Sequence, residues 1–262
     1  DRGLSAFIVG DSPMRLTPDA TSLQNWATNV NKAVEDNDNG LVTTNEYLGV
    51  FYPSGFTSDN FGNNVVVPAS HMMLRTIALS DQVSFPWFAP AGTRRGGITN
   101  ASSTGYINSE GEFVSTALNE GQRDTLYTNN VNPITFITGA GLVNYGQKTR
   151  FAGSSALDRI NVARLVIYLR SQLNKLARPY VFEPNDKITR DEIKAQAESL
   201  LLELVGNRAI FDFLVVCDET NNTPTRIDRN ELYLDIAIEP VKAVEFIYVP
   251  LRLKNTGEIA GL

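Results

Sequence analysis

Two long helical patterns followed by strand patterns fill the last third of the chain, and this order constrains the fold most. Ser155 precedes an apolar seam that predicts a helix over residues 156–177, with Asp158 completing a capping-box-like pattern. A second capping-box pattern at residues 189–192 predicts a helix that runs to Val205 and is closed by Gly206. Each helix must bury an apolar stripe, so we expect helices layered on a sheet.

Three strand candidates follow the helices. Residues 209–217 are nearly all apolar, as expected of a central strand, and residues 232–238 alternate between apolar and other side chains. Residues 244–253 also alternate but contain a proline, which cannot donate a ladder hydrogen bond and therefore indicates an edge or bulged strand. An open edge near a terminus is a site where another chain can add. The candidate subunit-linking residues are Val244, Phe246, Tyr248, Pro250 and Arg252.

The first half of the chain alternates between strand and helix patterns. Strands are predicted at residues 4–9 and 47–52, and helices at residues 21–35 and 68–79. Residues 86–111 are rich in Gly, Pro, Ser, Thr and Asn and are predicted to be an irregular loop. The fold class is therefore a mixed α/β (α+β) fold, with a mixed β-sheet flanked by helices. We predict two subdomains, residues 1–130 and residues 131–262.

Composition limits the classes of partner. The formal net charge is -6, whereas a nucleic-acid partner calls for a basic surface, so we expect no nucleic acid. No apolar run approaches the length of a membrane span. The lone Cys217 cannot form an internal disulfide and suits a buried position in a reducing compartment. The chain opens without Met and runs directly into residues 4–9, so we expect no leader peptide and a trimmed fragment.

The sequence offers little for catalysis. It holds one histidine, His71, and one cysteine, so no His-rich or Cys-rich metal site is expected, and it has no G-x-S-x-G or Walker A motif. Glu183 and Asp186 are better explained by turn and capping roles than by acid–base work. We predict no enzyme, no cofactor and no metal. The alternative is an α/β enzyme with a site in the loops of residues 86–111.

An ordered series of short motifs resembles a known family. The series resembles the C-terminal region of contractile phage tail sheath proteins, and weaker likenesses at residues 48–53, 67–70 and 89–92 extend it towards the N-terminus. Ser54 departs from the family pattern, and residues 94–121 match nothing in it. The motifs, in chain order, are Asn132-Pro133-Ile134, Gly139-Ala140-Gly141, residues 145–149, residues 159–165, residues 182–186, Val216-Cys217-Asp218, Asn221-Asn222-Thr223 and residues 236–240.

The resemblance implies a structural subunit of a virion, from a large-genome myovirus, assembled in the host cytoplasm. In that family, sixfold rings of subunits stack helically around a tail tube, and terminal arms add strands to a neighbour's sheet. Contraction drives the tube through the host envelope for genome delivery. The implied partners are other copies of the chain, the tail tube protein, the baseplate and the tail terminator. A bacteriocin or secretion-type injection machine is the alternative setting.

The resemblance also places the C-terminal domain against the tube. The charged side chains at the start of the second long helix are therefore candidates for a tube-facing surface, and an ordinary solvated helix face is an equally good interpretation. These residues are Lys187, Arg190, Lys194 and Glu198.

Overall fold

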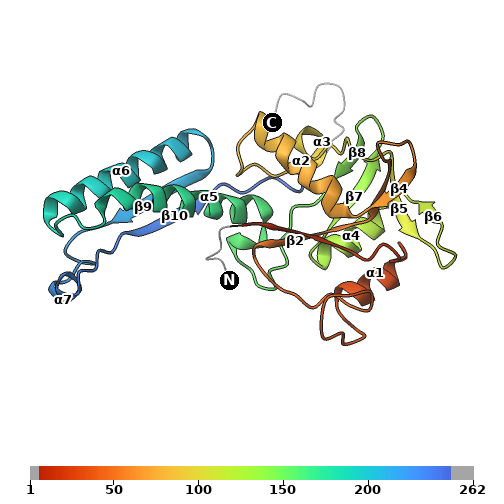
Figure 1. Ribbon diagram of the computed structural model, residues 1–262, viewed down its shortest axis with the longest axis horizontal. Coiled ribbons are helices and arrows are strands. Elements are labelled where there is room, and N and C mark those ends of the chain that lie inside the picture. The colour runs from red at the N-terminus through yellow and green to blue at the C-terminus, as the bar shows by residue number, and fades with distance from the viewer. Residues whose placement is uncertain (1–5, 249–262) are drawn as a thin grey trace, which may run out of the picture.

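A computed structural model describes residues 6–248, which form two lobes joined end to end (Figure 1). The N-terminal lobe ends with two strands that close its main sheet, and the C-terminal lobe consists of a helical hairpin on a small sheet. The N-terminal lobe contains β1 (Ile8–Asp11), α1 (Ala20–Ala27), β2 (Leu48–Tyr52), β3 (Ser54–Ser58), β4 (Asn64–Val67), α2 (Ala69–Val83), α3 (Gly92–Arg95), β5 (Ser103–Ile107), β6 (Phe113–Ser115), α4 (Glu120–Thr128), β7 (Val131–Ile137) and β8 (Gly141–Asn144). The C-terminal lobe contains η1 (Ala156–Asp158), α5 (Ile160–Ala177), η2 (Arg178–Tyr180), α6 (Lys187–Gly206), β9 (Ile210–Val216), α7 (Pro224–Asp228) and β10 (Asp235–Pro240).

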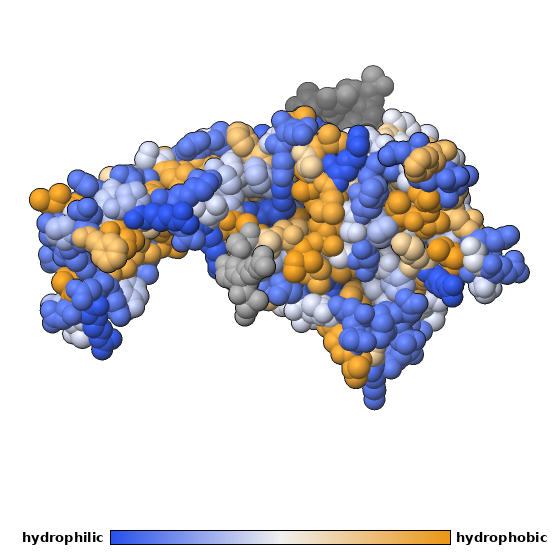
Figure 2. All heavy atoms as spheres, viewed as in Figure 1, coloured by the Kyte–Doolittle hydropathy of each residue, from blue (hydrophilic) through white to orange (hydrophobic). Residues whose placement is uncertain are grey.

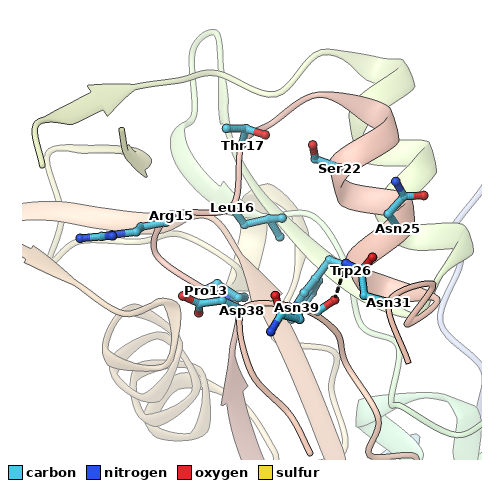
Figure 3. Close-up of a pocket in the computed structure, with 10 residues that line it drawn as sticks. All are labelled: Pro13, Arg15, Leu16, Thr17, Ser22, Asn25, Trp26, Asn31, Asp38 and Asn39. Atoms are coloured by element: carbon cyan, nitrogen blue, oxygen red, sulfur yellow. Dashed lines mark hydrogen bonds between the residues drawn. The ribbon is translucent and has the colours of Figure 1, made fainter. Parts of the chain in front are cut away.

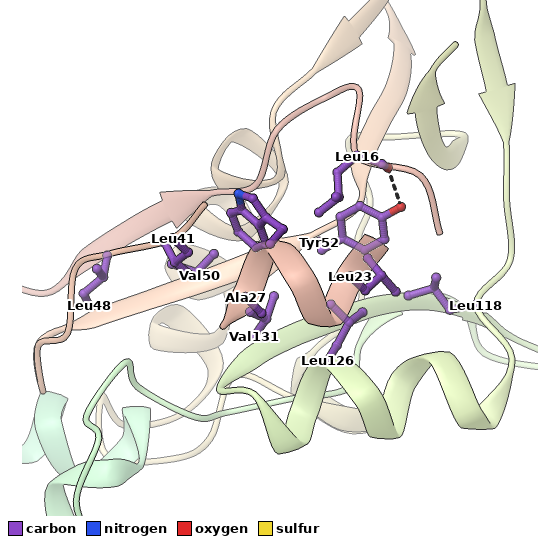
Figure 4. Packing of buried hydrophobic residues seen from close by; sticks show 11 residues of the cluster. Leu16, Leu23, Ala27, Leu41, Leu48, Val50, Tyr52, Leu118, Leu126 and Val131 are labelled. Atoms are coloured by element: carbon purple, nitrogen blue, oxygen red, sulfur yellow. Dashed lines mark hydrogen bonds between the residues drawn. The ribbon is translucent and has the colours of Figure 1, made fainter. Parts of the chain in front are cut away.

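The main sheet of the N-terminal lobe has the strand order β1-β2-β7-β8, in which β1, β2 and β7 are parallel and β8 is antiparallel to β7. All five residues of β2 are buried, as expected of a strand covered on both faces. Val50 and Tyr52 face α1 and α4, where they join the cluster of buried side chains shown in Figure 4. Phe51 faces the opposite way and packs with Met72 and Met73 of α2.

The mixed α/β fold class is therefore confirmed, but the predicted domain boundary falls inside this sheet. β7 pairs with β2 and β8, so residues 131–144 lie in the N-terminal lobe. The apolar and β-branched residues of β7 suit a strand within this sheet, and β7 does not begin a new domain. The two lobes meet near residue 150 instead of residue 130.

A second, antiparallel sheet with the order β4-β3-β5-β6 follows β2. The prediction of an irregular loop over residues 86–111 is therefore partly wrong, because this stretch contains α3 and β5. Gly105 explains the error: a Cβ atom there would lie 2.0 Å from the carbonyl oxygen of Val114 on β6. In this position glycine permits close strand pairing, whereas its presence in the sequence indicated a loop.

The C-terminal lobe pairs the α5–α6 hairpin with the β9-β10 sheet. Ser155 caps the short turn η1 through the Leu157 N–H, so α5 begins only at Ile160. Asp186 is the N-cap of α6 and accepts from the Thr189 N–H at 2.9 Å, which corrects the capping box predicted at residues 189–192. Its carboxylate has a capping role, as the sequence indicated.

Candidate subunit-linking surface

The β9-β10 sheet is incomplete within the described residues. Among residues 6–248, β9 pairs with β10 alone, so within that range it is not the central strand that the sequence predicts. A register shift near Glu239 and Pro240 leaves Phe211 without a paired residue on β10. Phe211 is 68% exposed and Leu214 is 61% exposed, although both belong to an apolar strand. An apolar strand with one free edge is a template for strand addition.

Residues 241–248, which we call the strap, leave β10 and run back towards the N-terminal lobe (Figure 1). The strap is extended but belongs to no sheet, so the predicted strand is absent over residues 244–248. Pro250 and Arg252 lie outside the described residues. Val244, Phe246 and Tyr248 are strongly exposed. The described part of the predicted linking strand thus presents its apolar side chains to solvent.

Glu245 is the one strap residue described with side-chain ties to the rest of the molecule. Its carboxylate accepts from Arg159 Nε at 2.6 Å, from the second Arg159 nitrogen at 3.1 Å and from Gln147 Nε2 at 3.1 Å. Burial acts to raise the pKa of Glu245, but the hydrogen bonds from Arg159 and Tyr127 outweigh it and leave the pKa below its usual value. Glu245 is therefore a carboxylate at neutral pH.

The root of the strap is fixed to the C-terminal lobe by backbone contacts. The Val241 N–H donates to the Ala209 carbonyl at 3.0 Å, and Asn161 Nδ2 donates to the Val241 carbonyl at 3.4 Å. A cavity of about 560 Å³ lies beneath the strap, between it and residues 154–162. The sequence alone did not point to Glu245, Gln147 or Arg159 as part of this surface. Gln147 and Arg159 do lie in two of the motifs that resemble the sheath family, at residues 145–149 and 159–165.

The candidate tube-facing residues do not form a single exposed surface. Lys187 is exposed and donates to Asp191 one turn later at 2.9 Å. Lys194 and Glu198 form a longer pair at 4.0 Å. Arg190 is instead buried and donates to the backbone and side-chain oxygens of Asn185. The prediction that Arg190 belongs to a charged face is wrong, because this side chain secures the turn before α6.

A second cavity lies away from the strap, in the N-terminal lobe. A hollow of about 280 Å³ lies between α1 and the loops beside it and is lined by Arg15, Asn25, Trp26, Asp38 and other residues (Figure 3). Trp26 donates to the Asn37 carbonyl at 3.0 Å and forms part of the core. Neither this hollow nor the cavity beneath the strap draws on residues 86–111.

Over residues 6–248, no group of three or more His, Cys, Asp or Glu side chains could hold a metal ion. Within the same residues, no helix is long and apolar enough to cross a membrane. Cys217 is buried, and burial raises the pKa of its thiol, which disfavours the reactive thiolate.

Comparisons with known proteins place the chain. Residues 153–254 match the phage tail sheath C-terminal domain. The tail sheath protein of Vibrio phage KVP40 is 35% identical over 248 residues, which cover 92% of this chain and 35% of that protein. The tail sheath protein of Enterobacteria phage T4 is 32% identical over 249 residues, with the same coverage of 92% and 35%. The chain thus spans about a third of the length of these relatives.

A solved structure has the same fold. It is the PVC sheath complex of an extracellular contractile injection system in its contracted state, with a TM-score of 0.72 and 17% identity over 97% of this chain and 65% of that chain. The shared fold covers both lobes, while the sequence matches cover nearly all of the chain. Residues 153–254 therefore belong to the phage tail sheath C-terminal domain family, and the chain as a whole is similar to phage tail sheath proteins.

Proposed function

We propose that this chain forms the body of a contractile tail sheath subunit, which polymerises around a tail tube and contracts to drive that tube through the host envelope. The observation that carries the proposal is the open β9 edge, together with a strap whose apolar side chains are exposed. Both features belong to an interface that another copy of the chain completes. A head-to-tail link of this kind does not close on itself and builds a helical filament.

Strand addition suits a sheath that contracts. Main-chain hydrogen bonds between a strap and a neighbouring β9 are independent of side-chain packing elsewhere on the subunit. They can therefore persist while neighbouring subunits shift as rigid bodies and other contacts are replaced. A metastable extended state needs a barrier between two packings and no chemical site, so we propose a non-enzymatic role.

The remaining partners follow from the family. We propose contacts with the tail tube, the baseplate and the tail terminator, and assembly in the host cytoplasm. Lys187, Lys194 and Glu198 remain candidates for the tube-facing surface because their side chains are at least partly exposed on α6. The sheath proteins of 35% and 32% identity reported above are phage proteins, which favours a phage tail over a bacteriocin or secretion-type machine.

Negative-stain electron microscopy of the complete gene product tests the proposal. We expect striated tubes or polysheaths, because each copy carries both an open edge and a linking segment. A complete protein that remained as single particles across protein concentrations and salt conditions would overturn the proposal. The matched variant is the complete protein with Leu214→Lys, which should form fewer tubes.

A further inference from the structure

The strap is extended and makes few backbone hydrogen bonds, yet it follows a defined course across the molecule. Its only described backbone tie is at Val241, next to β10. Glu245, four residues later, is the next point of attachment. Between these points Ala243 and Val244 are exposed, and beyond Glu245 the described residues are exposed again. The path of the strap therefore depends on a single inward-pointing side chain.

The partners of Glu245 come from both sides of the junction between the lobes. Arg159 lies immediately before α5 of the C-terminal lobe, whereas Gln147 follows β8 of the N-terminal lobe. The side chains of Glu245 and Arg159 are only 16% and 27% exposed, so water screens their attraction weakly. Asp158 holds Arg159 from its other side at 2.9 Å. The arginine is thus oriented before the strap docks on it.

We propose that Glu245 is a clamp that fixes the strap across the junction of the two lobes and so sets where the linking segment leaves the subunit. The inference deepens the proposed function, because it concerns the segment proposed to link copies of the chain. A clamped segment has already lost much of its conformational freedom, so pairing with a neighbouring copy costs less entropy. Clamping at the junction also directs tension on the segment into both lobes rather than into β10.

Trypsin provides a direct reporter, because Lys242 lies within the strap and is exposed. Cleavage after Lys242 requires several residues on each side to enter the protease, which a clamped strap resists. In the isolated 262-residue chain, Glu245→Gln and Arg159→Gln are each expected to speed cleavage after Lys242 about tenfold, which corresponds to about 1.4 kcal/mol of lost clamping. The products are identified by mass.

Matched controls separate the clamp from local sequence effects. Glu239→Gln is the control for Glu245→Gln and removes a negative charge from an exposed residue of β10. Arg178→Gln is the control for Arg159→Gln and removes a positive charge at the far end of α5. Both controls are expected to change the rate less than twofold. Rates for substitutions near Lys242 are divided by those of peptides spanning residues 238–248 with the same substitution. Arg159 lies far from Lys242 in sequence and needs no such correction.

Unchanged cleavage in both Glu245→Gln and Arg159→Gln would overturn the inference. If Arg159→Gln is too unstable for its cleavage rate to be compared, the rate for Glu245→Gln alone tests the inference, because Glu245 lies on the strap and not in the body of the molecule. The experiment uses single copies of the chain and does not depend on polymerisation. A complete protein that never formed tubes would therefore refute the proposed function without affecting this test, and a failed cleavage test would leave the proposed function standing.

Discussion

Asn132 is fully buried in β7, and its side-chain amide joins three backbone groups of the N-terminal lobe. Its Nδ2 donates to the Val50 carbonyl at 3.0 Å and to the Lys148 carbonyl at 2.8 Å, while its Oδ1 accepts from the Lys148 N–H at 2.7 Å. Gly146 leaves room for this arrangement, because a Cβ atom there would lie 2.7 Å from Asn132 Oδ1. Two motifs recognised in the sequence, at residues 132–134 and 145–149, are thus one structural unit.

Replacing Asn132 should therefore be costly. Asn132→Ala removes the side-chain partner of the buried Val50 carbonyl and of two partly buried backbone groups of Lys148, and we expect a loss of about 2–3 kcal/mol in the free energy of unfolding. Urea unfolding followed by circular dichroism measures the loss. Asn25→Ala, on the exposed side of α1, is the control and should change stability by less than about 0.5 kcal/mol. Equal effects for the two variants would refute the role of Asn132.

The pKa of Glu245 predicts a pH dependence for the clamp. Since the pKa of Glu245 in the folded chain lies below the ordinary glutamate value of 4.5, the Glu245–Arg159 pair contributes stability that is fully present above that value. The contribution is lost as the pH falls through the folded pKa. At pH 7 we expect Glu245→Gln to lower the free energy of unfolding by about 1–2 kcal/mol. The difference from the unsubstituted chain should shrink as the pH falls below 4.5, and a difference that grew there would contradict the assignment.

At the scale of elements, one aromatic side chain joins the two lobes. Trp87 follows α2 of the N-terminal lobe but is buried among Leu165, Leu201 and Ile210 of the C-terminal lobe. Its ring stacks on Phe85 with centroids 4.7 Å apart, and its Nε1 donates to the Asn207 carbonyl at 3.1 Å. A second tie between the lobes runs from Arg164 of α5 to Asp81 of α2. The core of the C-terminal lobe is therefore completed by a residue from outside it.

Trp87→Ala should destabilise the C-terminal lobe strongly. Removing a buried aromatic side chain costs about 3–5 kcal/mol, because it leaves a cavity and removes apolar contacts. Urea unfolding measures this loss, and the remaining Trp26 fluorescence reports separately on the N-terminal lobe. Phe61→Ala is a suitable control, since Phe61 is 90% exposed at the turn between β3 and β4. A loss below about 1 kcal/mol for Trp87→Ala would show that the lobes do not share a core.

β9 gives a prediction that separates folding from assembly. Leu214 is exposed on this strand, so Leu214→Lys should change the free energy of unfolding by less than about 0.5 kcal/mol. A strand added to the β9 edge would lie beside the new charge, and the cross-strand contact would be unfavourable. Sedimentation of polymers from the complete protein measures the effect. Normal polymers from this variant would argue against β9 as the docking edge.

Periodicity predicted most elements of this chain, and local chemistry explains the errors. The apolar stripe predicts a helix over residues 21–35, but α1 ends at Ala27. The helix cannot continue because Asn29 and Lys32 adopt left-handed backbone conformations with φ of 53°. The capping residue Asp186 was recognisable because its contact with Thr189 is local. The Glu245–Arg159 pair was not, because its members lie 86 residues apart and each alone resembles a surface charge. Whether an edge stays open is likewise a tertiary property, which the nearly continuous apolar pattern of β9 does not encode.

At the scale of the whole molecule, residues 6–248 form a two-lobed body, in which β9 pairs with β10 alone and the strap runs to the junction between the lobes (Figure 1). Figure 2 shows apolar residues on the outer surface of both lobes, in keeping with the exposure of Phe182, Leu214 and Val83. A body tied together by Trp87 and Arg164 is expected to move as one piece. Changes between sheath states would then occur at contacts between copies rather than within one.

Electron cryomicroscopy of polymers formed by the complete gene product tests strand addition most directly, because it resolves what lies on the free edge of β9. We expect a strand from a neighbouring copy there, formed by that copy's segment following Glu245. Finding the β9 edge empty in the polymer, or finding residues 244–253 paired only within their own chain, would contradict the account.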